Sequence, residues 1–322
     1  MFTVVPGDHA SNQAELMSPL LAGTRFRRVR WVAETGSTNS DAMALARDGA
    51  PEGTVVVADH QHAGRGRLGR PWTAPAGASL LVSVLLRPPA AVVGSVAMAA
   101  GLSMVEAVEE LTGVAPGLKW PNDLVVSLGG AAAGGISTAP GAADLVDPAD
   151  APGAGRAAVG GPDRKLAGIL AEADWPAGST AAGGWRPPRA DERLAVVVGL
   201  GINVNWPDSL PDSLPDDLAE IAIALNHLAG GPVDRAELLG AYLRRLDGHY
   251  GSLVAARSAS GLVDAWRARS ATLGRRVRVD LGDRDVEGTA VDLTDEGHLV
   301  VETVEGDRRT FAVGDVVHLR PL

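Results

Sequence analysis

The chain contains no cysteine, few aromatic residues and no excess of positive charge. The lack of cysteine excludes disulfide bonds, thiolate nucleophiles and cysteine-ligated metals, and it is typical of a protein in a reducing compartment. Aromatic residues make up only 4% of the 322 residues, so aliphatic side chains must fill most of the core. The formal charge of −10 argues against broad binding to nucleic acid or to an anionic membrane.

Long apolar segments and export signals are also missing. We find no apolar run of about 18 residues and therefore expect no membrane span. The N-terminus, MFTVVPGDHASNQAEL, lacks the basic start and the apolar stretch of a secretion signal. These features predict a cytoplasmic protein that has no membrane as a partner.

The most informative segment that is present is the loop Gly64-Arg65-Gly66-Arg67-Leu68-Gly69-Arg70-Pro71-Trp72. Arginine carries a permanent charge and a planar set of donors that matches carboxylate and phosphate oxygens. Glycine lets the backbone approach a ligand closely. A cationic loop on an acidic protein therefore indicates a small anionic ligand; taken alone, it is also compatible with a solvated basic loop or an arginine-glycine contact to nucleic acid.

The hydrophobic pattern predicts two domains. Residues 24–272 alternate between strands and helices, including an amphipathic helix over 98–111 and a continuous helix over 218–228. From residue 273 to 322, valines alternate with charged residues between short turns, which predicts a small antiparallel barrel. We expect residues 1–23 to form a poorly ordered lead-in.

A low-complexity segment interrupts the first domain. Of the 38 residues from 127 to 164, 24 are Gly, Ala or Pro and none is aromatic. Such a segment has too little side-chain surface to offset the entropy of ordering. We expect a disordered surface insertion here.

Two common nucleotide-binding patterns are excluded. The arginine loop is not a P-loop, because no Gly-Lys-Ser/Thr follows it. The segment Gly199-Leu200-Gly201-Ile202-Asn203 begins like a dinucleotide fingerprint but lacks the third glycine. The seven histidines show no helical pairing that would predict a metal site.

Five short segments, in this order along the chain, resemble biotin protein ligases. Together with the final barrel, the resemblance covers about residues 25–322, and the combination of the arginine loop with the Lys-Trp-Pro-Asn-Asp block is its most specific part. The segments are Ser37-Thr38-Asn39, Gln61 with the arginine loop, Lys119-Trp120-Pro121-Asn122-Asp123-Leu124, Lys165-Leu166-Ala167-Gly168-Ile169-Leu170, and the Gly199 to Asn203 segment.

The resemblance implies an α+β fold, in which a mixed-sheet catalytic domain of the biotin/lipoate ligase type precedes an SH3-like barrel. It also implies a two-step reaction. Biotin's carboxylate attacks the α-phosphate of ATP to give biotinyl-5′-AMP and pyrophosphate; a lysine amine of a biotin carboxyl carrier protein domain then attacks the mixed anhydride and releases AMP. Mg²⁺ accompanies ATP and is held mainly by phosphate and water, and we assign no protein metal ligands.

The same resemblance assigns roles to residues of this chain. Arg67, Lys165, Lys119 and Asp123 are the expected catalytic residues. The expected biotin contacts are Ser37, Thr38, Asn39, Gln61, Arg65, Gly66, Arg67 and Lys165. The expected ATP contacts are Arg65, Arg67, Arg70, Trp72, Lys119 and Asn203. Ser37 has a second interpretation as a helix N-cap, Trp72 as a core residue, and Lys165 as a surface lysine at a strand end.

Three alternatives stay open at this point. A lipoate ligase shares the catalytic architecture and the lysine target, although the arginine loop and the barrel favour biotin. A biotin-dependent transcriptional regulator would require DNA binding, and the few residues before the catalytic domain are too short for a winged helix, so no DNA is expected. In the third alternative, the terminal barrel is an adaptor for nucleic acid or peptide. Its mixed charges form no basic face, which argues against this role. The carboxylase that is served and the oligomeric state, including a homodimer, are not determined by the sequence.

Overall fold

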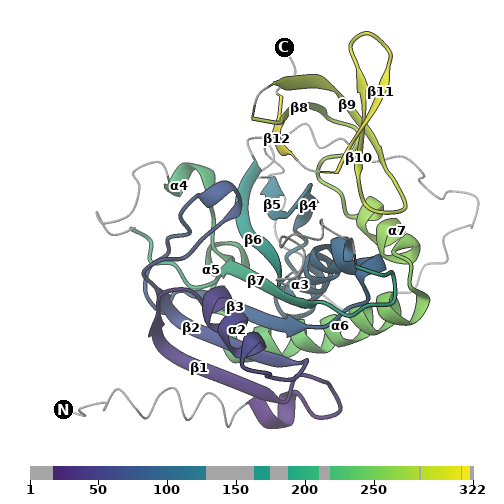
Figure 1. The fold of residues 1–322 in the computed structure, drawn as a ribbon. Helices are drawn as coiled ribbons and strands as arrows, with labels where there is room; N and C mark the ends of the chain where they lie inside the picture. Colours follow the sequence, from purple (N-terminus) through teal and green to yellow (C-terminus); the bar gives the residue numbers. More distant parts are fainter. Residues whose placement is uncertain are drawn as a thin grey trace, which may run out of the picture.

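The computed structural model describes most of the chain, in the ranges 17–127, 163–174, 188–209, 218–282, 284–312 and 314–319. These ranges form a seven-stranded sheet followed by a separate five-stranded sheet (Figure 1). The predicted α+β class, with a mixed sheet before a small antiparallel sheet, is confirmed.

The larger sheet has the strand order β1-β2-β3-β7-β6-β5-β4. Strand β1 is parallel to β2, and all the other neighbours are antiparallel. This arrangement places β6 and β7, which carry two of the predicted motifs, near the centre. The strands are β1 (Arg28–Thr35), β2 (Thr54–Gln61), β3 (Ser79–Leu86), β4 (Gly117–Lys119), β5 (Asp123–Ser127), β6 (Asp163–Asp174) and β7 (Ala195–Asn203).

Helices cover both faces of this sheet. Helix α2 (Thr38–Arg47) packs on β2, β3 and β7, while α3 (Val96–Thr112) and α6 (Arg235–Ala256) cover the opposite face (Figure 1). The side chains of a strand alternate between the two faces. Accordingly, Val56 joins the small core under α2, whereas Val55 joins the main core.

The second sheet packs against the first domain through buried contacts. Trp120, in the turn between β4 and β5, donates its indole N–H to the carbonyl of Gly297 at 3.0 Å. Helix α7 (Ser260–Ala268) contacts β9 of the second sheet. The strand order of this second sheet is β11-β10-β9-β8-β12. Its strands are β8 (Arg276–Asp280), β9 (Asp285–Leu293), β10 (Leu299–Thr303), β11 (Arg308–Phe311) and β12 (Asp315–His318).

Two expected segments differ from the structure. Of the expected lead-in, residues 17–23 are described, and they bury Met17 and Leu21 in the main core. The helix expected over 218–228 is instead two short helices, α4 (Leu218–Ile221) and α5 (Leu225–Ala229). The chain between them extends so that Ile223 can donate its N–H to the carbonyl of Lys165 at 3.0 Å.

The expected insertion, 127–164, falls mainly outside the described residues. Its two ends are described and are regular: Ser127 closes β5, and Asp163 and Arg164 open β6. Ser127 and Asp163 are partners in the antiparallel register, and the Ser127 hydroxyl donates to Asp163 at 2.5 Å. The sheet therefore holds the two ends of the insertion side by side.

Among the described residues, one helical segment, Ala90–Thr112, is long and apolar enough to cross a membrane, and the mean hydropathy of its most apolar window is 1.8. In the fold, 72% of its most apolar window is buried, and α3 packs between the sheet and α6. Its apolar character is therefore what a core helix requires.

Candidate active site

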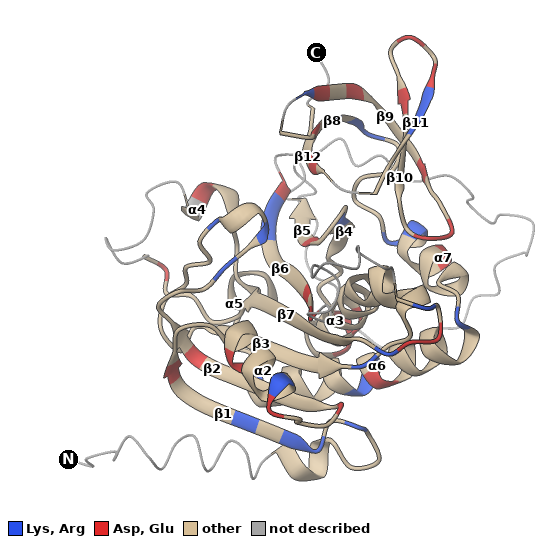
Figure 2. Ribbon diagram, in the orientation of Figure 1, with Lys and Arg blue, Asp and Glu red and all other residues tan. Residues whose placement is uncertain are grey.

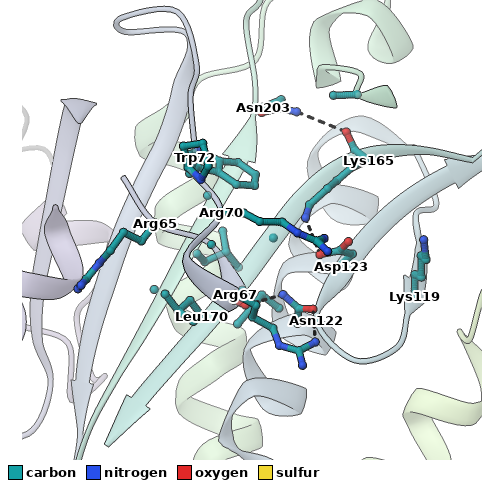
Figure 3. Close-up of a pocket in the computed structure, with 18 of the residues that line it drawn as sticks. Arg65, Arg67, Arg70, Trp72, Lys119, Asn122, Asp123, Lys165, Leu170 and Asn203 are labelled. Atoms are coloured by element: carbon teal, nitrogen blue, oxygen red, sulfur yellow. Dashed lines mark hydrogen bonds and ion pairs between the residues drawn. The ribbon is translucent and has the colours of Figure 1, made fainter. Parts of the chain in front are cut away.

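All thirteen predicted site residues line one cavity of about 570 Å³. The start of α2, the arginine loop, the β4–β5 turn, the central strands β6 and β7, and strand β12 enclose it (Figure 3). Figure 2 shows that charged residues are sparse on the central strands and gather at the start of β6. The cavity is lined by Ser37, Thr38, Asn39, Gln61, Arg65, Gly66, Arg67, Arg70, Trp72, Lys119, Asp123, Lys165 and Asn203, among others.

One end of the cavity is built from neutral polar groups at the start of α2. Ser37 occupies the N-cap position, but its side chain makes no cap hydrogen bond. The side-chain carbonyl of Gln61 accepts the N–H of Thr38 at 2.6 Å and its hydroxyl at 2.9 Å. The buried hydroxyl of Ser83 lies 2.8 Å from the Thr38 hydroxyl and 2.6 Å from Oδ1 of Asn39.

Within this polar end, Thr38, Ser83 and Asn39 form a group in which one proton is shared between two acceptors. The Thr38 hydroxyl gives its proton to Gln61, so the single proton of Ser83 faces two acceptors, on Thr38 and Asn39. A buried acceptor without a donor costs about 1–3 kcal/mol. A ligand that brings an N–H donor to this end therefore relieves a deficit, whereas a ligand without one does not.

Asn39 is held by the protein at every polar position. Its Nδ2 donates to the carbonyl of Leu170 at 3.3 Å and to Glu172 at 2.7 Å, which directs Oδ1 towards Ser83. A Cβ atom on Gly199 would lie 2.1 Å from Oδ1 of Asn39. Gly199 therefore leaves room on β7 for the Asn39 amide, and any larger side chain would displace it.

The arginine loop is a small hairpin over the cavity. Gly66 donates its N–H to the carbonyl of Arg70 at 2.7 Å, and Trp72 donates to the carbonyl of Gly64 at 2.9 Å. At its tip Leu68 is 75% exposed and has a φ of 55°, in the left-handed region that glycine prefers. The tip thus combines backbone strain with an exposed apolar side chain.

Arg67 and Arg70 contact the second domain. Nη1 of Arg67 lies 3.6 Å and Nη2 of Arg70 lies 2.5 Å from the carboxylate of Asp315, on β12. Arg67 also donates to the carbonyl of Gly314 and, at 3.2 Å, to the side-chain oxygen of Asn122. The loop tip is therefore bound to the barrel and to the Lys-Trp-Pro-Asn-Asp turn.

Lys165 and Asp123 form the central charged pair of the cavity. Nζ of Lys165 lies 2.7 Å from Oδ1 of Asp123 and 5.5 Å from the centre of the Trp72 ring (Figure 3). The Trp72 ring packs closely against β6 and β7: a Cβ atom would meet the ring at 2.9 Å on Gly168 and at 2.6 Å on Gly201. The two glycines thus make room for an aromatic surface beside the lysine.

Lys119, at the end of β4, is a second, partly buried lysine of the cavity. Burial lowers the pKa of Lys119, although the carboxylates of Asp123 and Asp163 oppose this shift. Its amine therefore loses its proton more readily than an exposed lysine. An anion that enters the cavity would favour the charged form of Lys119, as its predicted role requires.

Asn203 ends β7 with an acceptor that the protein leaves unused. Its side chain is 2% exposed, and Nδ2 donates to the carbonyls of Ile223 and Lys165 at 3.1 and 3.4 Å. These bonds fix the amide, and Oδ1 has no hydrogen-bond partner within the described part of the chain. The site thus presents a fixed acceptor next to Trp72 and Lys165.

Beside Lys165, a buried cluster joins the two domains. The carboxylate of Asp163 lies 2.7 Å from Nδ1 of His318 and 2.7 Å from Nη1 of Arg275. Burial opposes ionisation of Asp163, yet the hydrogen bonds from His318 and Ser127 and the charge of Arg275 outweigh it and hold its pKa well below the usual range. The start of β6 is therefore anchored to the barrel.

Sequence reasoning missed four residues that organise this site. Asn122 lies inside the predicted Lys-Trp-Pro-Asn-Asp block and was detectable there. Ser83 interrupts a fully buried strand, which was a weaker signal. Glu172 and Asp315 gave no local signal, because each meets its arginine only through the tertiary fold.

Comparisons with known proteins agree with this geometry. Residues 33–174 match the Biotin/lipoate A/B protein ligase family, and residues 272–319 match the Biotin protein ligase C terminal domain. Fold and site thus define a protein ligase of the biotin/lipoate class.

Individual relatives narrow this class. The chain is 35% identical to the Biotin--[acetyl-CoA-carboxylase] ligase of Mycobacterium tuberculosis over 98% of this chain and 97% of that protein. It is 28% identical to the Bifunctional ligase/repressor BirA of Bacillus subtilis over 86% of this chain and 70% of that protein. The chain belongs to the biotin protein ligase family, and it is an enzyme of the ligase type.

A solved structure shows the same fold. The biotin protein ligase from Aquifex aeolicus in complex with biotin and ATP aligns with a TM-score of 0.64 and 26% identity, and the match covers 92% of this chain and all of that one.

Proposed function

We propose that this enzyme forms biotinyl-5′-AMP from biotin and ATP and then transfers biotin to one lysine of a biotin carboxyl carrier protein domain. The observation that carries this proposal is that one cavity combines three kinds of group. They are a polar end in which Thr38, Ser83 and Asn39 share one hydroxyl proton, a cluster of cations around Lys165, and an aromatic surface close to the unused acceptor of Asn203.

The polar end supports biotin rather than lipoate as the acid. The ureido ring of biotin carries two N–H donors and a carbonyl, and it can supply the proton that Thr38, Ser83 and Asn39 lack. The dithiolane ring of lipoate carries no N–H group. A buried polar site rejects a ligand that leaves its groups unpaired.

The cations suit the joining of two anions. Biotin's carboxylate and the α-phosphate repel each other, and Arg67 and Lys165 can neutralise both while they hold the attacking oxygen near phosphorus. Lys165 must leave Asp123 to do so. Asp123 is then free to accept a proton from the incoming carrier amine in the second step.

Trp72 and Asn203 suit the nucleotide base. Oδ1 of Asn203 can accept the exocyclic N–H of adenine while Trp72 provides a stacking surface. Mg²⁺ would enter with the phosphates. Within the described ranges no group of three or more His, Cys, Asp or Glu side chains could hold a metal ion, so phosphate and water would supply most of its ligands.

The decisive experiment offers the protein ATP, Mg²⁺ and a carrier domain, with biotin or lipoate in separate reactions. Intact-mass analysis of the carrier should show one added biotin and no lipoyl product. Pyrophosphate release without carrier reports the first step separately. A lipoyl product alone would overturn the choice of acid, and no pyrophosphate release with either acid would overturn the acyl-adenylate mechanism.

A further inference from the structure

Glu172, on β6, contacts both the arginine loop and Asn39, at the polar end of the cavity. Its Oε1 lies 3.6 Å from Nη2 of Arg65, and its Oε2 accepts a hydrogen bond from Asn39 at 2.7 Å. Its side chain is 36% exposed, and that of Arg65 is 50% exposed. Figure 3 shows Arg65 directed away from the other labelled cations.

The contacts continue from Asn39 through the other residues of the polar end. Asn39 accepts from Ser83, whose hydroxyl also reaches Thr38, and Thr38 bonds to Gln61. Both N–H groups of Asn39 are engaged, and the shorter of these bonds ends on Glu172. The amide orientation on which this series depends is therefore set in large part by the Glu172 carboxylate.

We propose that Glu172 is a positioning residue that fixes the loop and the acid-binding end of the cavity together. One carboxylate oxygen holds Arg65, and thereby the first limb of the hairpin, while the other holds Asn39. This inference rests on the proposed function, because it assigns Glu172 to the binding of the biotin acid.

The position of Arg65 explains how its contact with Glu172 could assist ligand binding. Arg65 and the two residues that follow it, Gly66 and Arg67, line the cavity, so a ligand that binds there would need this part of the loop in place. Arg65 also donates to the hydroxyl of Ser40, on α2, at 3.2 Å. Glu172 and Ser40 therefore order the first limb before the ligand arrives, and the ordering cost at binding falls.

Two substitutions separate the two contacts. Glu172→Gln keeps an oxygen that can accept from Asn39 but removes the charge that attracts Arg65. Glu172→Ala removes both. Asp174→Asn is a matched control, because Asp174 lies two residues further on β6, is also 36% exposed, and pairs at 3.2 Å with Arg47 of α2, which does not line the cavity.

The measurements are the KM for biotin, the KM for ATP and kcat of pyrophosphate release. Glu172→Gln should raise the biotin KM about 2- to 5-fold, a small change because both partners are solvent-exposed. Glu172→Ala should raise it at least about 10-fold, because an Asn39 donor loses its partner in a buried site. The ATP KM and kcat should stay within about twofold of wild type, as should all three values for Asp174→Asn.

A double-mutant cycle tests the Arg65 contact directly. Once Arg65 is replaced by alanine, Glu172→Gln should add little to the biotin KM. An unchanged or lower biotin KM in Glu172→Gln, equal effects of the Gln and Ala variants, or additivity in the cycle would overturn the inference. These results require a wild-type enzyme that releases pyrophosphate with biotin, so a failure of the proposed function would be seen first and separately.

Discussion

Nζ of Lys165 lies 2.7 Å from Oδ1 of Asp123, and this ion pair joins the start of β6 to the start of β5. The pair occupies the region where the carboxylate of the acid and the α-phosphate must meet in the proposed reaction. Lys165 therefore has to exchange one anionic partner for another during the first step. Such an exchange retains its positive charge, which the transition state requires.

Replacement of this lysine should stop the first step without unfolding the protein. Because Lys165 is partly exposed, Lys165→Ala leaves no large cavity, and we expect a melting temperature close to that of wild type. Loss of a charge aimed at the reacting phosphate should reduce the rate of pyrophosphate release about 100-fold or more. Arg67→Ala should act in the same direction. Normal pyrophosphate release by both variants would refute their predicted roles.

The glycines beneath Trp72 provide a second test. A methyl group on Gly201 would approach the indole ring to 2.6 Å, so Gly201→Ala should displace Trp72 from β7. We expect the KM for ATP to rise about 10-fold while the KM for biotin changes less, because Trp72 is the proposed stacking surface for the base. The control is Gly248→Ala, on α6, where nothing lies within 4 Å of the new methyl group. Equal changes in both KM values would argue against this division of the cavity.

The residues singled out in the sequence all line one cavity, because most of them lie in short local motifs. Thr38 with Asn39, the arginine loop, and Lys165 with Gly168 are short segments whose residue types carry chemistry by themselves. Strand alternation and helical periodicity likewise predicted the two sheets. What the sequence could not predict were contacts between distant segments.

Arg67 and Gly314 illustrate that limit, since 247 positions separate them in the chain. No local pattern indicates that β12 reaches the arginine loop, or that a glutamate on β6 faces Arg65. The prediction of a continuous helix over 218–228 was wrong for a related reason. Its apolar residues have a suitable period, but the backbone of Ile223 bonds to Lys165 instead of continuing the helix.

Asp315 should control how firmly the loop tip is held before a ligand binds. It is the carboxylate closest to both Arg67 and Arg70, and its side chain is 17% exposed. In ligand-free Asp315→Asn, trypsin should therefore cleave after Arg67 several-fold faster than in wild type. Mass spectrometry of the fragment that ends at Arg67 reports this cleavage. An unchanged rate would show that the barrel does not restrain the loop.

The cluster around Asp163 predicts a dependence of stability on pH. The pKa of Asp163 is lower in the folded chain than in the unfolded chain. Its ionised form therefore stabilises the fold above a pH of about 4, and this contribution is lost as the pH falls further. Asp163→Asn should have a lower melting temperature than wild type at pH 7, and the difference should shrink between pH 5 and pH 3.

His318 gives a contrasting pH range in the same cluster. Burial lowers its pKa, although the bond to Asp163 opposes this shift. The unfolded chain therefore takes up a proton at His318 before the folded chain does, and stability falls as the pH drops below about 6.5. His318→Asn should remove part of the decrease in melting temperature between pH 7 and pH 5. Identical slopes in this range would contradict the assignment.

Removal of the insertion should leave the enzyme active. Ser127 and Asp163 are neighbours in the register of β5 and β6, and Arg275 contacts both side chains. Deletion of residues 130–160 would connect these strands through Leu128, Gly129, Gly161 and Pro162, a loop length that is common in hairpins. Carrier biotinylation and the KM for biotin should then stay within about twofold of wild type. A large loss of carrier biotinylation with normal pyrophosphate release would instead assign the insertion to recognition of the carrier, because in the proposed mechanism the first step uses only groups that line the cavity.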